Sequence, residues 1–224
     1  MIDCASCRAA FAPENDYDDF AQDLETHFPD CICQQFSVGV SSPGPIADGE
    51  ILYRAFVDPT DVDEKTMELA RRAFGWAYRN GLSVFRESAT DDDITALISD
   101  ILTVKPGKKQ KRVLALFRFV CRQIRSLTET RLPNSPRMFC VYDQTVPRIS
   151  NPELPHVPTH AGVFFRHMKP QSVGKRQLQK DCETVLYQVI SRERVDVATF
   201  RNGLIEDRNQ QSLAGAFVIG QALS

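Results

Sequence analysis

The chain of 224 residues is 42% hydrophobic and 25% charged, with a formal net charge of −2. This composition is typical of a soluble globular protein of one or two domains, and no apolar run approaches the ~20 residues that a membrane span needs. Because the first residues lack the basic start and the apolar stretch of a signal peptide, we expect a cytoplasmic protein of prokaryotic type that does not contact a membrane.

The small net charge hides a strong asymmetry along the chain. Residues 1–68 carry 15 acidic and three basic side chains, a balance of −12, and the remainder balances at +10. Such polarity indicates either that the two parts face each other or that each faces a different charged partner. One hypothesis is therefore that the acidic residues 1–36 mask a basic surface elsewhere in the chain.

Composition also predicts the domain organisation. Residues 1–36 are acidic and contain four cysteines, and residues 37–49 are rich in Ser, Pro and Gly, which favours a linker. The patterned stretch 50–170 predicts a core domain. Residues 171–224 predict a helical tail that packs on this core.

Apolar patterns predict the elements of the core in chain order. The first are a strand over 50–57, a helix over about 61–79 that Thr60 or Asp61 can cap, a strand over 81–88 and a helix capped by Thr90. A strand from 112 to about 117 then continues as a helix to 127. Strands over 137–144 and 159–167 and helices from 175 follow. In the stretch GLSVFRES, alternation sends Ser83 and Phe85 to one face and Val84 and Arg86 to the other. Strands separated by helices predict an α+β fold with a mixed sheet and flanking helices.

The cysteines fall into two groups. Soft ligands of the kind that tetrahedral zinc prefers gather in the acidic module: Cys4, Cys7, Cys31 and Cys33, with His27 as a substitute ligand. The second pair has Cys-x-Cys spacing, which is less usual for zinc, so free thiols are the alternative to a structural zinc site. Cys121, Cys140 and Cys182 each stand among apolar residues and predict core thiols.

A basic stretch predicts a surface for a polyanion. Residues 105–137 hold ten Lys or Arg and one acid, Glu129, and the candidate contacts are Lys108, Lys109, Lys111, Arg112, Arg118, Arg122 and Arg125. If residues 118–127 are helical, the last three arginines share a face and can contact successive phosphates. The alternatives are an acidic protein partner, the acidic module itself, or water.

Two polar residues in apolar strands are candidates for a small-molecule site. Arg54 lies in GEILYRAF, and because burying an unpaired guanidinium costs several kcal/mol, it needs an anionic ligand or an acidic partner such as Glu87. His160 precedes Ala161 and Gly162, whose small size lets a ligand approach the backbone. The alternative for His160 is a loop-fixing hydrogen bond.

Short motifs in a set order carry a resemblance. LYR, AF, LSV followed by arginine, and Pro-x-HA occur in this order between residues 49 and 167. This order resembles a family of small prokaryotic proteins of unassigned activity, and the resemblance implies functional residues at Arg54, Ser83, Arg86 and His160.

The LYR strand is also similar to the opening strand of mono-ADP-ribosyltransferases and of RES-type NAD-consuming toxins. In those enzymes a strand arginine meets the phosphate side of NAD, and later strands bring a serine and a glutamate. The likeness implies Arg54 as a phosphate clamp and Ser83 as the serine. Glu87 is the nearby glutamate, in a different order along the chain.

Two hypotheses for function follow. The first is a nucleotide- or NAD-related toxin- or effector-like domain with Arg54, Ser83, Glu87 and His160 in catalytic positions, and with ligand contacts from Tyr53, Arg86 and Thr159. The second is a non-catalytic binding or regulatory module whose basic surface, residues 105–137, holds nucleic acid or an acidic protein partner.

Overall fold

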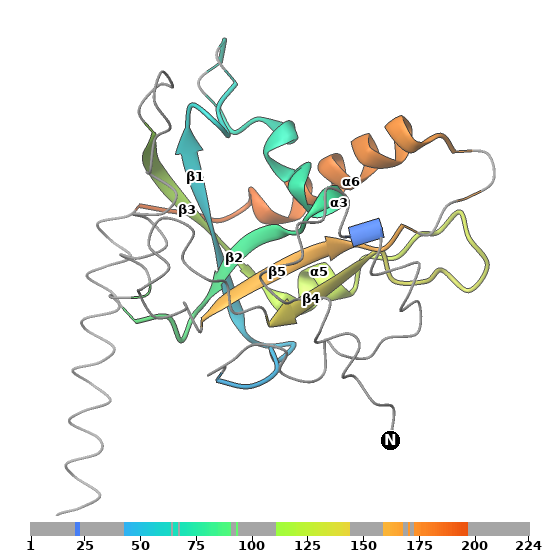
Figure 1. The fold of residues 1–224 in the computed structure, drawn as a ribbon, viewed down its shortest axis with the longest axis horizontal. Coiled ribbons are helices and arrows are strands. Elements are labelled where there is room, and N and C mark those ends of the chain that lie inside the picture. Colours follow the sequence, from blue (N-terminus) through green and yellow to red (C-terminus); the bar gives the residue numbers. More distant parts are fainter. Residues whose placement is uncertain are drawn as a thin grey trace, which may run out of the picture.

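The computed structural model describes residues 21–22, 43–63, 65–66, 68–90, 93, 111–143, 159–167, 170 and 173–196. Within these residues six strands form one sheet in the order β4-β5-β2-β1-β3-β6 (Figure 1), and each neighbouring pair is antiparallel. The α+β class is therefore confirmed. The expected mixed sheet is wrong, since the described strands form no parallel pair.

The first five strands follow the predicted segments, whereas the short β6 lies where the sequence predicts a helical tail. The strands are β1 (Ile51–Asp58), β2 (Leu82–Arg86), β3 (Arg112–Val120), β4 (Phe139–Asp143), β5 (His160–Phe165) and β6 (Arg194–Val195). The helices are the 3-10 helix η2 (Arg71–Phe74), α3 (Trp76–Arg79), α5 (Cys121–Arg125) and α6 (Lys175–Ile190). Both helical pieces of the predicted 61–79 helix are short, which is the largest departure from the predicted elements.

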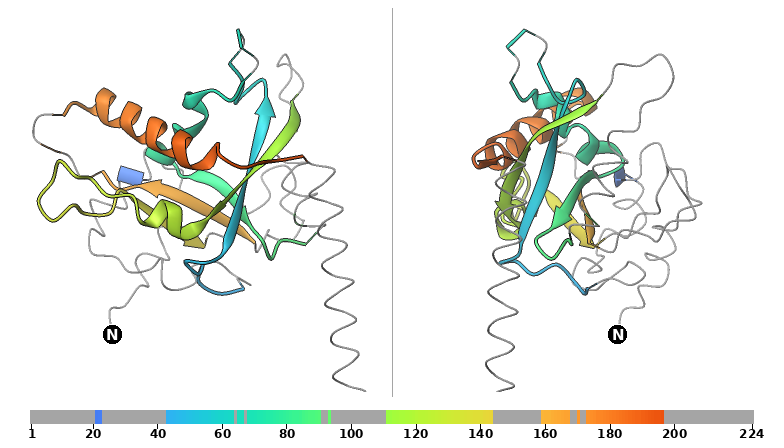
Figure 2. Two further views of the ribbon diagram at one scale, coloured as in Figure 1. Left: turned by 180° about the vertical axis from the view of Figure 1, so that it is seen from behind. Right: turned by 90° about the vertical axis from the view of Figure 1, so that its left-hand side faces the viewer.

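Helices cover one face of the sheet, which we call the helical face (Figure 2). α6 lies across this face with Leu178, Cys182 and Leu186 buried, and α3 packs between α6 and β5. The strands contribute a large apolar core, which includes Leu52 and Val84. Apolar residues three and four apart on α6 form the stripe that this core requires.

The opposite face of the sheet carries a second apolar cluster. Tyr53 stacks on Phe85 with ring centroids 5.5 Å apart, and Ala55, Val57 and Leu116 complete the cluster. Because strand side chains alternate, Phe85 belongs to this second face and Val84 to the helical face, as the sequence predicts.

The segment between β1 and the first helix folds as a turn. The carboxylate of Asp61 accepts a hydrogen bond from the Val57 amide at 3.1 Å, and the Asp61 amide donates to the Val57 carbonyl at 2.7 Å. Asp61 therefore ties the chain back onto the end of β1, so it does not cap a helix there. Helical structure begins only at Arg71.

The three predicted core thiols are confirmed. Cys121, Cys140 and Cys182 are buried thiols. Burial raises the pKa of the Cys121 thiol to about 11, so little of it is ionised at neutral pH.

Three predicted features lie largely or wholly outside the described residues. The first is the acidic module 1–36, of which only residues 21–22 are described. The others are the beginning of the linker 37–49 and the tail beyond residue 196. The described end of the linker packs on the core through Ile46, which is buried. In the described part of the chain, no helix is both long and apolar enough to cross a membrane.

Candidate functional site

Ser83 and His160 meet on the second face of the sheet. The two residues lie on neighbouring strands, where Ser83 pairs with Gly162 and Phe85 pairs with His160. The serine Oγ is 2.6 Å from His160 Nε2, and the tautomer of the ring decides which atom donates. His160 is buried, with 5% of its surface exposed, whereas Ser83 is exposed. A buried imidazole thus holds a hydroxyl that solvent can reach.

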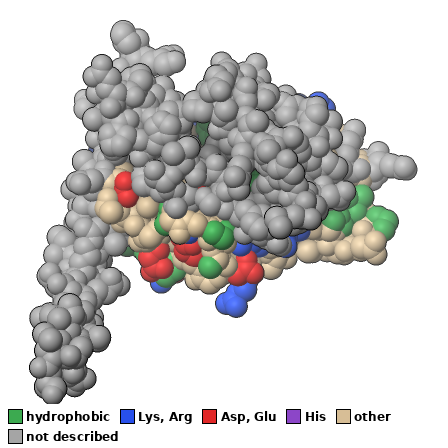
Figure 3. Space-filling model, turned by 60° about the horizontal axis from the view of Figure 1, so that its bottom comes forward, with side chains coloured by type: hydrophobic (Ala, Val, Ile, Leu, Met, Phe, Trp, Pro, Cys, Tyr) green, Lys and Arg blue, Asp and Glu red, His purple; other side chains and the backbone are tan. Residues whose placement is uncertain are grey.

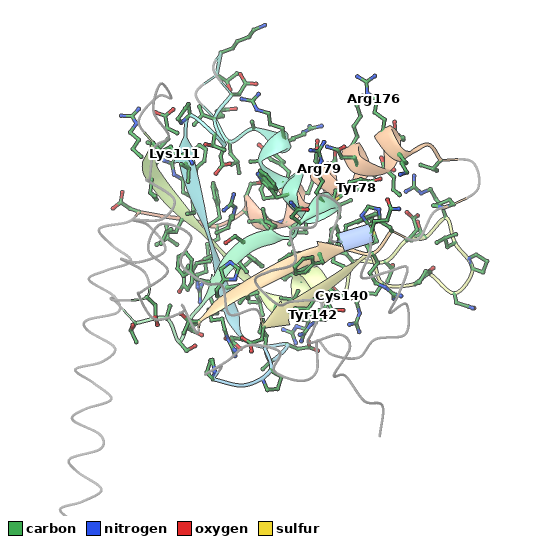
Figure 4. All side chains as sticks on the ribbon, in the orientation of Figure 1. Tyr78, Arg79, Lys111, Cys140, Tyr142 and Arg176 are labelled. Carbon is green, nitrogen blue, oxygen red and sulfur yellow. The ribbon has the colours of Figure 1, made fainter. Side chains whose placement is uncertain are left out.

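The sequence of β5 explains this arrangement locally. Ala161, Val163 and Phe165 alternate into the helical core, so His160 and Gly162 must point to the second face. Gly162 stands between Ser83 on one side and Tyr142 on the other in the strand register. Figure 4 labels Tyr142 on β4. Gly162 is itself buried and places no side chain between these two residues.

Arg54 lies on the helical face and is held by Asp61. It alternates between Leu52 and Phe56, both part of the helical core, and 13% of its side chain is exposed. Its Nη2 atom is 3.5 Å from Asp61 Oδ2. The interpretation of Glu87 as its acidic partner is wrong: Glu87 is exposed, and its amide donates to the Ile51 carbonyl.

A fork between β1 and β2 brings Arg54 to Ser83. The two strands pair only at Leu52–Arg86 and Tyr53–Phe85 and then separate (Figure 1). Arg54 Nη1 donates to the carbonyl of Ser83 at 3.4 Å, on the side of β2 that faces β1. Ser83 therefore touches Arg54 through its backbone and His160 through its hydroxyl.

The resulting chain Asp61, Arg54, Ser83, His160, which we call the fork network, passes from one face of the sheet to the other. Burial lowers the pKa of Arg54 and raises that of Asp61, while the charge of each partner opposes the shift. Asp61 Oδ1 is buried and has no hydrogen-bond partner in the described part of the chain. An unsatisfied carboxylate oxygen favours the protonated acid.

We expect the charge of Asp61 to make the protein less stable as pH rises. A carboxyl whose folded pKa lies above its ordinary value of 3.8 binds more protons in the folded state, so its stabilisation is complete below that value and is lost as pH rises through the folded pKa. In Asp61→Asn this loss is absent. The free energy of unfolding of the variant, relative to the parent in urea, should therefore increase from pH 4 upward, and a constant difference would contradict the raised pKa.

Arg86 and Thr159 form a buried polar cluster beside the fork network. Arg86 binds the Glu50 carboxylate through Nε at 2.6 Å and Nη2 at 2.8 Å, and Nη1 reaches Asp143 at 3.3 Å and the Gly44 carbonyl at 2.6 Å. Its backbone amide donates to the carbonyl of Thr159. These contacts give Arg86 a structural role, because it joins three segments of the chain. The sequence predicts a ligand contact at this position instead. The hydroxyl of Thr159 is buried without a partner in the described residues.

The predicted one-face arginine stripe is wrong. β3 continues to Val120, so Arg118 is on a strand, where it binds Glu193 at 2.7 Å, and Arg125 on α5 binds Asp48 at 2.8 Å. The strand persists because its residues pair with β1 along its whole length.

The remaining members of the predicted basic surface are mostly neutralised or undescribed. Arg112 binds Asp58, and Arg122 is exposed on α5. Lys111 begins the described stretch, while Lys108 and Lys109 lie outside it. Figure 3 shows basic and acidic side chains side by side on the described surface. The structure therefore offers little support for this surface as a polyanion site.

Metal binding by the acidic module stays a prediction, because Cys4, Cys7, His27, Cys31 and Cys33 lie outside the described residues. Among the residues that are described, no group of three or more His, Cys, Asp or Glu side chains is placed to hold a metal ion.

Sequence reasoning missed Asp61 as a member of the site. Its position in DPTD, directly after a strand that carries an arginine, was a usable signal, because a chain that turns back at a strand end returns to its own strand. The sequence pattern instead indicates Asp61 as a candidate cap of the 61–79 helix. Tyr53, a predicted ligand contact, stacks on Phe85, and burial is the main cause of its raised pKa.

Fold and site together define an α+β protein in which an antiparallel six-stranded sheet carries a Ser–His pair on the face opposite its helices. Comparison with known proteins adds no relative: no family model matches the chain, and neither a curated protein nor a solved structure matches it.

Proposed function

We propose that this protein binds a nucleotide or NAD-related small molecule at the Ser83–His160 pair, as a domain of the toxin or effector type. The single observation that carries the proposal is the 2.6 Å contact between an exposed hydroxyl and a buried imidazole. A side chain pair of this geometry is the arrangement by which enzymes activate a hydroxyl or orient a polar ligand. The motif order LYR, LSV-x-R and Pro-x-HA supports the choice of ligand by resemblance alone.

The pair can work in two ways. When Nδ1 of His160 carries the ring proton, Nε2 accepts the hydrogen bond from Ser83 and can take its proton as a general base. In the other tautomer Nε2 donates to the serine oxygen, and the hydroxyl proton is available for a ligand. Both forms suit a ribose hydroxyl, which can accept and donate.

Arg54 supplies positive charge close to this pair. As a phosphate clamp it would have to exchange Asp61, 3.5 Å away, for the phosphate. Protonation of Asp61, whose pKa is raised, would release the guanidinium for such an exchange. Arg54 is therefore proposed as a clamp whose strength increases toward acidic pH. Glu87, exposed and away from the guanidinium, has no role in this scheme.

Ligand-induced thermal stabilisation tests the proposal. NAD, ADP-ribose, ATP and AMP are added separately to the full chain, and a ligand at 100 times its dissociation constant stabilises the fold by about 2.7 kcal/mol. Ser83→Ala should abolish the shift in Tm, measured against the variant's own unliganded Tm. His160→Gln should reduce it.

Ser126→Ala is the matched control, because Ser126 is an exposed serine at the end of α5, bonded to the Gln123 carbonyl. It should keep the full shift. If none of the four ligands stabilises the parent protein, or if Ser83→Ala keeps the parent's shift, the proposal fails.

We further propose three features of the protein from its sequence alone. They are a structural zinc in the acidic module, a helical tail beyond α6, and a location in the cytoplasm.

A further inference from the structure

Trp76 is exposed on the surface of the helical layer. It is the one tryptophan of the chain, and among the described residues it is the one large apolar side chain that is exposed, at 51%. Its neighbours on α3, Ala77 and Tyr78, are buried, so the helix turns Trp76 outward. Arg79, three residues later, lies on the same side of the helix and is also exposed.

The helices η2 and α6, which both contact α3, also carry exposed cations. α6 packs on both η2 and α3. A Cβ atom at Gly75 would be 2.9 Å from Glu183 and 3.6 Å from Gln179, and the Arg71 guanidinium is 5.7 Å from the Tyr187 ring centre. The exposed side of α6 therefore lies next to the exposed sides of η2 and α3.

The stripe of α6 that faces η2 and α3 continues toward the start of the helix through two further cations. Arg176, Lys180, Glu183 and Tyr187 are spaced three or four residues apart, so they follow one side of α6. Figure 4 shows Arg176 projecting away from the body of the protein. We call the exposed set Arg71, Trp76, Arg79, Arg176 and Lys180 the Trp76 surface.

Among the described residues, the cations of the Trp76 surface lack carboxylate partners, unlike most arginines of the basic stretch. Within the described part of the chain, none of them forms an ion pair. Four arginines of the basic stretch, in contrast, each bind an Asp or Glu: Arg112, Arg118, Arg125 and Arg131. One carboxylate, Glu183, lies where the helices meet and accepts a hydrogen bond from Gln179. The positive charge around Trp76 is thus largely uncompensated.

We propose that the Trp76 surface binds single-stranded nucleic acid. Every base has a π-face that can stack on an exposed indole, and the surrounding cations can neutralise the flanking phosphates. An acidic polypeptide would satisfy the charges but would leave the indole without a stacking partner. This surface is separate from the Ser83–His160 pair, which lies on the opposite face of the sheet, so each proposal can fail alone.

Tryptophan fluorescence, excited selectively over tyrosine, tests the stacking directly, because Trp76 is the one tryptophan of the chain. A 12-nucleotide oligothymidylate should quench this emission, and its affinity should fall steeply as salt increases. Polyphosphate, which has no bases, should compete with the oligonucleotide without quenching. A poly-glutamate peptide that binds more tightly than the oligonucleotide would overturn the proposal in favour of an acidic chain. The acidic residues 1–36 would then be a candidate, since Lys175 at the start of α6 is 3.4 Å from Gln22.

Variants are compared by anisotropy of a labelled oligonucleotide, since Trp76→Ala has no tryptophan. Trp76→Ala should weaken binding by about 5- to 150-fold, the range for loss of one stacked base. Arg79→Glu and Arg176→Glu should weaken it and reduce its salt dependence. Circular dichroism confirms that each variant is folded.

The matched control is Arg122→Glu, a charge reversal at an exposed arginine of the basic stretch that has no ion pair in the described residues. It should bind like the parent, and so should Ser83→Ala. If Arg122→Glu weakens binding while Trp76→Ala does not, the nucleic acid lies on the other surface and the proposal is overturned.

Discussion

Replacing Arg86 with methionine is expected to lower the free energy of unfolding by about 3–5 kcal/mol, the range for breaking a buried ion pair from one side. Arg86 is 4% exposed and binds two carboxylates, Glu50 and Asp143, together with the Gly44 carbonyl. Methionine fills much of the same volume but cannot donate to either carboxylate or to the carbonyl. Their lost interactions dominate the effect, since the aliphatic part of the side chain is kept.

The control for this prediction is Arg112→Met. Arg112 also binds a carboxylate, Asp58 at 2.7 Å, but its side chain is 65% exposed. An exposed pair of this kind contributes about 0.2–1 kcal/mol. Urea unfolding followed by circular dichroism measures both variants. Equal losses in the two would show that the Arg86 cluster does not behave as a buried one.

Gly81→Ala is expected to destabilise the protein by about 2–5 kcal/mol, from two independent causes. Gly81 has a φ of +92°, a conformation that costs an L-residue about 1–2 kcal/mol. A Cβ atom there would also lie 2.5 Å from Phe164 Cζ and closer still to Cε1. Phe164 is buried against Tyr142, so the ring has little room to move, and overpacking adds about 1–3 kcal/mol.

Gly49→Ala provides the comparison, because a Cβ atom at Gly49 meets nothing within 4 Å. It should change the free energy of unfolding by less than about 1 kcal/mol. Gly81 directly precedes β2, the strand of Ser83, so a Gly81→Ala variant that still folds should also show reduced ligand-induced stabilisation. A loss no larger than that of Gly49→Ala would mean that the turn before β2 adapts freely.

The strands could be predicted because their signal is local. Short, mostly apolar runs mark β1, β2 and β5. The opposite faces of Phe85 and Val84 follow from a period of two that holds in any sheet. The segment after β1 was harder, since Asp61 suits both a helix cap and a turn. The hydrogen bonds between Asp61 and Val57, one in each direction, decide for the turn, and they depend on the end of β1 being present as a partner.

The antiparallel direction of the strands was not predicted, because the segment after β1 was read as a long helix. A helix of some 19 residues between β1 and β2 would favour a crossover and a parallel pair. The chain instead makes a turn and two short helices and returns antiparallel beside β1. A separate error, the strand end predicted at about residue 117, misplaced Arg118, whose strand is extended by pairing with β1.

By itself the sequence determined the α+β class, the positions of most strands and the need of Arg54 for an acidic partner or an anionic ligand, because these depend on neighbouring residues and on the cost of burying charge. Only the tertiary structure decided that Asp61 is the acidic partner of Arg54 and that Arg86 is held by Glu50. It also brought Ser83 and His160, 77 residues apart, to within 2.6 Å of each other. The physical reason is that strand register joins distant segments, and a shift of one residue would have sent His160 to the helical face.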